Sequence, residues 1–283
     1  MATNIFGYCD PKFAKVENVF RKLFNDGWEF EGASFSAYHK GKLVVDLKGG
    51  YSDSSSNAKW KDNTRTIVFS SSKAVGALCI AVAVDRGYCK YEEKVSKYWS
   101  NFAKNGKENT TILHIVNHQK ISFNNPEVHF LEQAGALGIT KARDLAKLFS
   151  LMIRGDLISK DLAKRFYEPL LKEKDVVLNA LHVKGHGFMY EPHPKKPGKW
   201  LVGHPGYGGN NVMVDPEEEI VVAYVTNGIK AAGGDMVLPY RLLRNAVFDS
   251  LEKFPKENVL DGTLEDAAPP NKEFYIKNEE LIH

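Results

Sequence analysis

Cysteine, excess charge and long hydrophobic runs are all scarce in this chain of 283 residues. It has 3 cysteines without paired spacing, which argues against a disulfide framework and favours a reducing compartment. The 38 basic residues exceed the 35 acidic ones by too little, and are too scattered, to indicate nucleic-acid binding. The longest uncharged apolar run, Ala74 to Val84, is too short to span a bilayer, so no membrane segment is expected.

The start of the sequence also lacks a recognisable targeting signal. Met1 to Tyr8 has neither the charged nor the apolar region of a signal peptide, and a cytoplasmic location is therefore expected. With 43% hydrophobic residues, the chain can bury the core of one large domain, which we assign to residues 11–254, with a C-terminal tail at 255–283. Cys79 falls within the apolar run and is expected to be a small core residue.

The most informative motif is a Ser-x-x-Lys tetrad just before the apolar run. Ser70 follows an extended segment, Thr66 to Phe69, and would stand at the positive end of a helix dipole. Lys73 lies one turn further along the same helical face, where it can accept the proton of the Ser70 hydroxyl. Desolvation lowers the pKa of a lysine towards that task. The pattern is typical of acyl transfer through a serine nucleophile.

The tetrad alone is not specific, because serine and lysine are common residues. It occurs at Ser56/Lys59, Ser70/Lys73 and Ser250/Lys253. Only the Ser70 copy precedes an apolar helix that could exclude water. An N-cap serine followed by a solvated lysine is the alternative interpretation.

Hydrophobic periodicity predicts an α+β fold. An amphipathic helix at 11–27 precedes a β-hairpin formed by residues 32–39 and 43–47. Strands near both ends of the chain, with helices between them, favour one antiparallel sheet built from both termini over a doubly wound sheet. The further elements expected are a helix at 144–154 with Thr140 as its N-cap and Gly155 at its end, strands at 187–190, 200–203, 210–214 and 220–225, and a closing helix at 236–254.

Three further patterns point less clearly to a function. His114 and His118 have the spacing of zinc ligands on a helix, but the catalytic Glu and a third ligand are missing. Capping or packing is favoured for them, and no metal or other cofactor is expected. Gly203 to Gly209 is glycine-dense, but a strand follows it, which favours a close backbone approach beside a pocket over a phosphate loop. The absence of Gly-x-Ser-x-Gly argues against an α/β-hydrolase.

Taken in order, several stretches resemble the β-lactamase-related serine hydrolases, the group of class C β-lactamases, penicillin-binding proteins and esterases, in their eukaryotic branch. The resemblance covers most of residues 15–250. It implies the β-lactamase/transpeptidase-like form of the α+β fold, with an antiparallel sheet and flanking helices. The matching stretches are 69–73 with the apolar helix, 112–118, 138–149, 203–209, Asp215-Pro216 and Val225-Thr226-Asn227.

The resemblance also implies roles for individual residues. Ser70 would be the acylated nucleophile and Lys73 its proton acceptor. His204-Pro205-Gly206 stands where many relatives have Lys-Thr-Gly, on the strand that edges the active site. The backbone N–H of Tyr207 would join that of Ser70 as an oxyanion hole. For His204, a turn histidine that packs against a tryptophan is the alternative.

The sequence departs from this family between His118 and Gly138. Relatives have a helical lobe in this region and a Tyr-x-Asn element, whose tyrosine helps to shuttle protons. Here the intervening segment is short, and Phe123-Asn124-Asn125 echoes the element without the hydroxyl. We therefore expect the all-helical lobe to be reduced, with the shortening between about 119 and 137.

Two functions are compatible with these observations. The first is a serine hydrolase that acts on a small-molecule ester or amide through an acyl-enzyme. The second is a catalytically weak or inactive family member with a binding or regulatory role. The intact Ser70, Lys73 and His204-Pro205-Gly206 favour the first, and the missing Tyr-x-Asn favours the second. The oligomeric state stays open.

Overall fold

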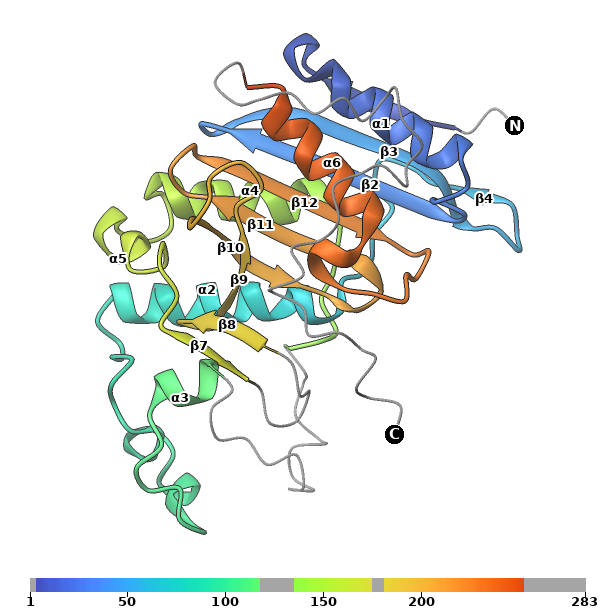
Figure 1. Ribbon diagram of the computed structural model, residues 1–283. Helices are drawn as coiled ribbons and strands as arrows, with labels where there is room; N and C mark the ends of the chain where they lie inside the picture. The colour runs from blue at the N-terminus through green and yellow to red at the C-terminus, as the bar shows by residue number, and fades with distance from the viewer. Residues whose placement is uncertain (1–3, 118–134, 175–180, 252–283) are drawn as a thin grey trace.

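The computed structural model describes residues 4–117, 135–174 and 181–251. Within these residues, 10 strands form one sheet whose neighbouring strands are all antiparallel (Figure 1). The strand order is β1-β3-β2-β12-β11-β10-β9-β8-β7, and β4 pairs with β3 outside this path. The strands are β1 (Phe6–Cys9), β2 (Gly32–His39), β3 (Lys42–Asp53), β4 (Ala58–Lys59), β7 (Leu171–Lys174), β8 (Leu181–Gly185), β9 (Phe188–Pro192), β10 (Trp200–Pro205), β11 (Asn211–Asp215) and β12 (Ile220–Thr226).

Helices cover both faces of this sheet. Helices α1 (Ala14–Asn25) and α6 (Leu238–Asp249) lie side by side on one face, and α2 (Ser72–Asp85) and α4 (Ala142–Arg154) lie on the other (Figure 1). Strand β12 is buried along its whole length, which explains why Ile220–Thr226 is an almost continuous apolar run. The smaller described elements are α3 (Ile112–Val116), α5 (Lys160–Lys164) and a two-stranded sheet of β5 (Thr66–Ile67) and β6 (Ile139–Thr140).

The β2–β3 hairpin depends on its two-residue turn. Lys40 and Gly41 both have left-handed backbones, with φ of 51° and 77°. Positive φ at both positions matches the right-handed twist of the flanking strands. The Lys40 N–H also donates to the carbonyl of Glu219 over 2.9 Å, which ties this turn to the β11–β12 turn. The N-terminal hairpin is thereby held in register against the C-terminal strands.

The α+β fold expected from the sequence is confirmed. Strand β2 pairs with β12 from Ala33↔Thr226 to His39↔Ile220, so the sheet does combine both ends of the chain. The predicted helices at 11–27, 144–154 and 236–254 are present as α1, α4 and α6 within the described residues. Strands β9 to β12 lie where four strands were expected.

Other expectations were wrong or incomplete. Thr140 is not the N-cap of α4, because it pairs with Thr66 in the β5–β6 sheet and the helix begins two residues later. Gly155 does end α4, with a left-handed φ of 88°. Cys79 is exposed rather than buried, because α2 turns only part of its surface towards the sheet. Strands β1, β4, β6, β7 and β8 were not predicted from the sequence.

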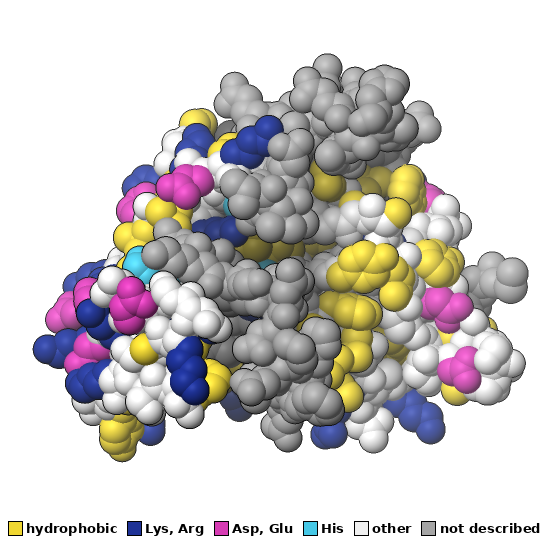
Figure 2. Space-filling model, turned by 90° about the horizontal axis from the view of Figure 1, so that it is seen from below, with side chains coloured by type: hydrophobic (Ala, Val, Ile, Leu, Met, Phe, Trp, Pro, Cys, Tyr) yellow, Lys and Arg dark blue, Asp and Glu magenta, His cyan; other side chains and the backbone are white. Residues whose placement is uncertain are grey.

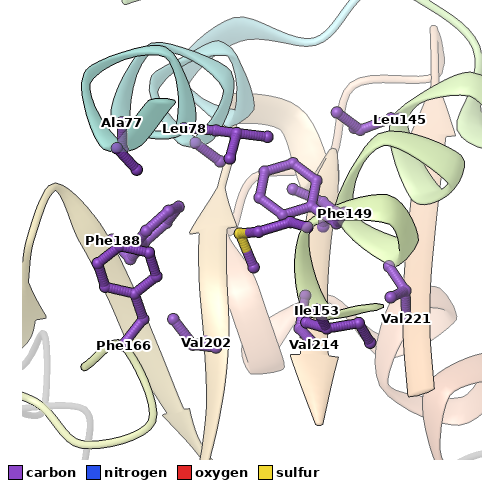
Figure 3. Close-up of a cluster of buried hydrophobic side chains, with 14 of the residues drawn as sticks. Ala77, Leu78, Leu145, Phe149, Ile153, Phe166, Phe188, Val202, Val214 and Val221 are labelled. Carbon is purple, nitrogen blue, oxygen red and sulfur yellow. The ribbon is translucent and has the colours of Figure 1, made fainter. Parts of the chain in front are cut away.

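Two apolar clusters, one on each face of the sheet, form the core. The cluster on the α2 and α4 side joins Ala77 and Leu78 of α2 to Leu145 and Phe149 of α4. Figure 3 shows these helical side chains directed towards valines of β10, β11 and β12. Each methylene buried in this way contributes about 0.8 kcal/mol. This packing fixes α2, and with it the Ser70 turn, against the sheet.

No helix of the described residues is long and apolar enough to cross a membrane. The segment from 118 to 134, where the sequence predicts most of the shortened lobe, lies outside the described residues, as do residues 252–283 with the predicted tail. The domain boundaries therefore stay predictions.

We predict that Phe149→Ala lowers the free energy of unfolding by about 3–5 kcal/mol, because the ring is fully buried and its removal leaves a cavity. Equilibrium urea unfolding measures the change. Leu170→Ala is the control, since Leu170 is 49% exposed and its truncation should change stability by no more than about 0.5 kcal/mol. A loss below about 1 kcal/mol for Phe149→Ala would contradict the packing described above.

Candidate active site

The Ser70 turn is a short 3-10 segment, Phe69–Ser71, that leads directly into α2. Phe69 has a left-handed backbone with φ of 47°, which is rare for a bulky residue. Such conformations persist only where the surrounding structure imposes them, and they gather at functional sites. The sequence predicts Ser70 in the first turn of the helix, but Ser70 lies instead in the 3-10 segment that leads into it, since α2 begins at Ser72.

Lys73 contacts Ser70 directly. Its Nζ lies 2.9 Å from Ser70 Oγ and donates to the carbonyl oxygen of Gly135 over 2.7 Å. Burial lowers the pKa of Lys73 below its ordinary value, and no carboxylate contributes to that shift. A half-buried amine of this kind can exist in the neutral form that accepts a proton. The predicted hydrogen-bond distance between Ser70 and Lys73 is confirmed.

Strand β10 reaches the Ser70 turn at its carboxyl end. A Cβ added to Gly206 would lie 2.4 Å from the carbonyl oxygen of Val68 and 2.8 Å from Ser71 Oγ. Only a residue without a side chain fits between them, which explains the glycine at this position. The dense glycines of 203–209 therefore serve a close backbone approach, as the sequence indicates.

Tyr207 extends this contact across the turn. Its ring meets that of Phe69 edge to face, with centroids 5.6 Å apart, and the side chain is 65% exposed. His204 is buried, and its Nδ1 lies 2.6 Å from the carbonyl oxygen of Pro205. Because a carbonyl only accepts, Nδ1 carries the hydrogen. The structure thus gathers Ser70, Lys73, Gly206 and Tyr207 around one turn, with His204 buried two residues before Gly206.

A second glycine segment flanks the turn on the other side. The Gly138 N–H donates to Ser72 Oγ over 2.9 Å, and the Val68 N–H donates to the carbonyl of Gly138 over 2.9 Å. Together with the Gly135 carbonyl on Lys73, these contacts make residues 135–138 part of the site. The sequence predicts no role for them: it places residues 135–137 in the shortened segment, and Gly138 only begins the matching stretch 138–149. The only signal was the pair of glycines itself.

The other candidate motifs lie elsewhere. Ser56 is exposed in a turn, where its hydroxyl donates to Asp53 over 2.6 Å. Ser250 caps α6 by donating to the Ala246 carbonyl over 2.8 Å. His114 accepts from the Thr111 N–H and caps α3, as favoured above, while His118 lies outside the described residues. Of the three tetrads, only the one at Ser70 has its serine beside its lysine in the described part of the chain.

Comparison with known proteins identifies the family. A family model described as beta-lactamase matches residues 20–120 and 119–245. The chain belongs to this beta-lactamase family. The two matched stretches meet at residues 119–120, inside the region that the sequence predicts to be shortened.

Individual relatives agree with that assignment. The esterase/beta-lactamase LipL of Mycobacterium tuberculosis is 36% identical over 115 residues, which are 41% of this chain and only 27% of that protein. A penicillin-binding protein homolog from Caulobacter crescentus has a TM-score of 0.77 at 23% identity and covers 88% of this chain and 100% of its own. A family VIII carboxylesterase has a TM-score of 0.77 at 20% identity with the same coverage. These structures establish the β-lactamase/transpeptidase-like fold, and the family supports a serine hydrolase-type function.

We predict that Gly206→Ala slows labelling of Ser70 by a fluorophosphonate about 10²-fold, the usual effect of moving a reacting group by about 1 Å. The added methyl group would push β10 away from Val68 and Ser71. Gly76→Ala in α2 is the matched control, because its Cβ would meet no atom within 4 Å. Equal labelling of both variants would mean that the close approach at Gly206 does not position Ser70.

Proposed function

We propose that the protein is a serine esterase that works through an acyl-enzyme on Ser70, with Lys73 as its general base. The observation that carries this proposal is the 2.9 Å contact between Lys73 Nζ and Ser70 Oγ, made by a lysine whose pKa burial lowers. A serine hydroxyl with a neutral amine base can act on an ester or an amide, and the similarity to an esterase/beta-lactamase and to a family VIII carboxylesterase favours a small-molecule ester. A cytoplasmic location and the absence of a nucleic-acid partner stay predictions.

The reaction begins when neutral Lys73 takes the proton of Ser70 Oγ, which then attacks the ester carbonyl carbon. The tetrahedral oxyanion would accept from the N–H groups of Ser70 and Tyr207. Both residues stand in the first turn of a 3-10 segment, Phe69–Ser71 and Tyr207–Gly209, where N–H groups have no acceptor within the segment. The Lys73 ammonium then gives its proton to the departing alkoxide, and the acyl group stays on Ser70.

Deacylation reverses these transfers with water in place of the alcohol. Lys73 takes a proton from the attacking water, and the same proton returns to Ser70 Oγ as the carboxylic acid leaves. The carbonyl of Gly135 orients the Lys73 amine throughout, since it accepts an N–H from either the neutral or the charged form. His204 would shape the pocket beside the oxyanion donors rather than exchange protons, since its Nδ1–H is bound to a backbone carbonyl.

One observation favours the second candidate, a weak or inactive member with a binding role. Among the described residues, Lys73 contacts only Ser70 Oγ and the Gly135 carbonyl, so no tyrosine hydroxyl joins the pair there. A missing proton relay typically lowers a rate about 10²–10⁴-fold. The proposed esterase is therefore slow.

We predict that Ser70→Ala abolishes the hydrolysis of p-nitrophenyl acetate and the fluorophosphonate labelling of the chain. Ser56→Ala is the matched control, because Ser56 has the same tetrad spacing in an exposed turn and should retain full activity. Equal rates for wild type and Ser70→Ala would exclude Ser70 as the nucleophile and leave the binding role.

We also predict that the hydrolysis rate rises with pH through the pKa of Lys73, because only the neutral amine accepts a proton. Since burial lowers this pKa, the rising limb should lie below the ordinary lysine value of about 10.4. Lys73→Arg stays charged and should lower the rate about 10²–10⁴-fold. The measurement is a pH–rate profile with Lys59→Arg as control, and a limb at the ordinary lysine value would contradict the role of Lys73.

A further inference from the structure

Exposed apolar side chains gather beside the Ser70 turn. Tyr207, Ile229 and Met236 are 65%, 49% and 40% exposed, and we call these three the apolar patch. Figure 2 shows exposed hydrophobic side chains in a band on the face seen from below Figure 1. Scattered surface apolar residues need no explanation, but a contiguous group beside a reactive serine does.

Contacts between two loops hold the segment that carries Ile229 and Met236 next to Tyr207. Lys230 N–H donates to the Gly208 carbonyl over 3.0 Å, and a Cβ at Gly208 would lie 3.2 Å from Ile229 Cγ2. On the far side of the same loop, a Cβ at Gly209 would lie 3.2 Å from Val237 Cγ1. The segment 229–237 therefore packs along residues 206–209, whose Tyr207 ring contacts Phe69.

The charged groups near the patch are engaged inside the protein. The Lys230 ammonium donates to Glu29 and to the Gly228 carbonyl, each over 2.8 Å, and its side chain is only 12% exposed. Asp235 pairs with Arg244 over 2.6 Å and is mostly buried. Phe30 continues the apolar surface past Lys230, whose Nζ lies 4.9 Å from the centre of its ring. The surface beside Ser70 thus offers apolar contact to a ligand, while the charges of Lys230 and Asp235 are already paired within the protein.

We propose that the apolar patch binds an uncharged alkyl or aryl group of the substrate, so that the protein prefers esters with an apolar chain of medium length. This inference rests on the proposed esterase function. The proposed occupant is part of the substrate because the patch adjoins the nucleophile: the Tyr207 ring contacts Phe69, the residue next to Ser70, and Ile229 packs on Gly208. A carboxylate or ammonium placed there would lose hydration without gaining a partner.

The test is hydrolysis of two ester series by the wild type and by the double variant Ile229→Ser/Met236→Ser. One series lengthens the acyl chain of p-nitrophenyl esters from acetate to hexanoate, and the other lengthens the alcohol of acetate esters from methyl to hexyl. A half-covered methylene should raise kcat/KM about twofold, so the wild type should gain about 16-fold over the four methylenes added in the acyl series, or about 30-fold over the five added in the alcohol series. The double variant should lose most of that gain and keep its rate on the shortest ester within about twofold.

The pattern of results separates the alternatives. A gain in the acyl series alone places the acyl chain on the patch, and a gain in the alcohol series alone places the alcohol there. Leu170→Ser, which changes an equally exposed leucine on the far β7 side, should keep the wild-type gain. No gain with length in either series, or an equal gain in the double variant, would overturn the inference.

A binding measurement keeps the inference testable if the esterase proposal fails. Octanoate should bind the Ser70→Ala protein in NMR titrations, with its chain on the patch and its carboxylate towards Lys73. The triple variant that adds Ile229→Ser and Met236→Ser should bind it at least fivefold more weakly. If the wild type does not hydrolyse esters but Ser70→Ala binds octanoate and the triple variant binds it more weakly, only the esterase proposal is refuted. If Ser70→Ala does not bind octanoate, or the triple variant binds it equally well, the patch proposal is refuted.

Discussion

The site depends on one steric constraint, the space between the Ser70 turn and the two glycine segments beside it. Gly206 of the β10 end meets Val68 and Ser71, and a Cβ at Gly138 would lie 2.5 Å from Ser72 Oγ. Neither approach leaves room for a side chain. Because both glycine segments pack this closely on the turn, the turn has little freedom, and the left-handed Phe69 can be maintained.

The opposite face of the sheet supports the same site with buried charges. Arg244 of α6 contacts Glu191 of β9 over 3.4 Å and Asp235 over 2.6 Å. Burial raises the pKa of Glu191 to about 7, while Arg244 opposes that shift. Arg241 adds a hydrogen bond to the Asp235 carbonyl over 3.1 Å. These contacts anchor the end of the loop between β12 and α6, next to Met236, so a buried polar network on one face of the sheet helps to hold the apolar patch.

Much of the architecture could be predicted from periodicity and glycine placement. The apolar patterns at 32–47 and 220–225 predict strands without any knowledge of the strands they pair with. Cys79 shows the limit of that reasoning, because an apolar helix without a polar face does not reveal which of its residues meet the sheet. Short strands such as β7, with the charged sequence Leu171–Lys174, form through pairing with a neighbour rather than through their own pattern.

The candidate site was predictable where local spacing sets the geometry. The distance from Ser70 to Lys73 follows from one helical turn, whereas the Gly135 carbonyl on Lys73 joins residues 62 positions apart. No sequence pattern encodes such a contact. The apolar patch has the same origin, since Tyr207, Ile229 and Met236 become neighbours only when two loops pack together.

The pairing of β2 with β12 has a consequence for the order in which the protein forms. Thr226 Oγ1 donates to the Gly32 carbonyl, a contact between residues 194 positions apart that joins the neighbouring strands β12 and β2. During synthesis the β2 edge of the N-terminal hairpin therefore stays unpaired until β12, the last strand of the sheet, has been made. Contacts between residues so far apart in the sequence also form slowly. Strands β10 and β12 are both made late in synthesis. A growing chain therefore exposes the Ser70 hydroxyl well before residues 206 and 207, which would flank it in the folded site, have been added.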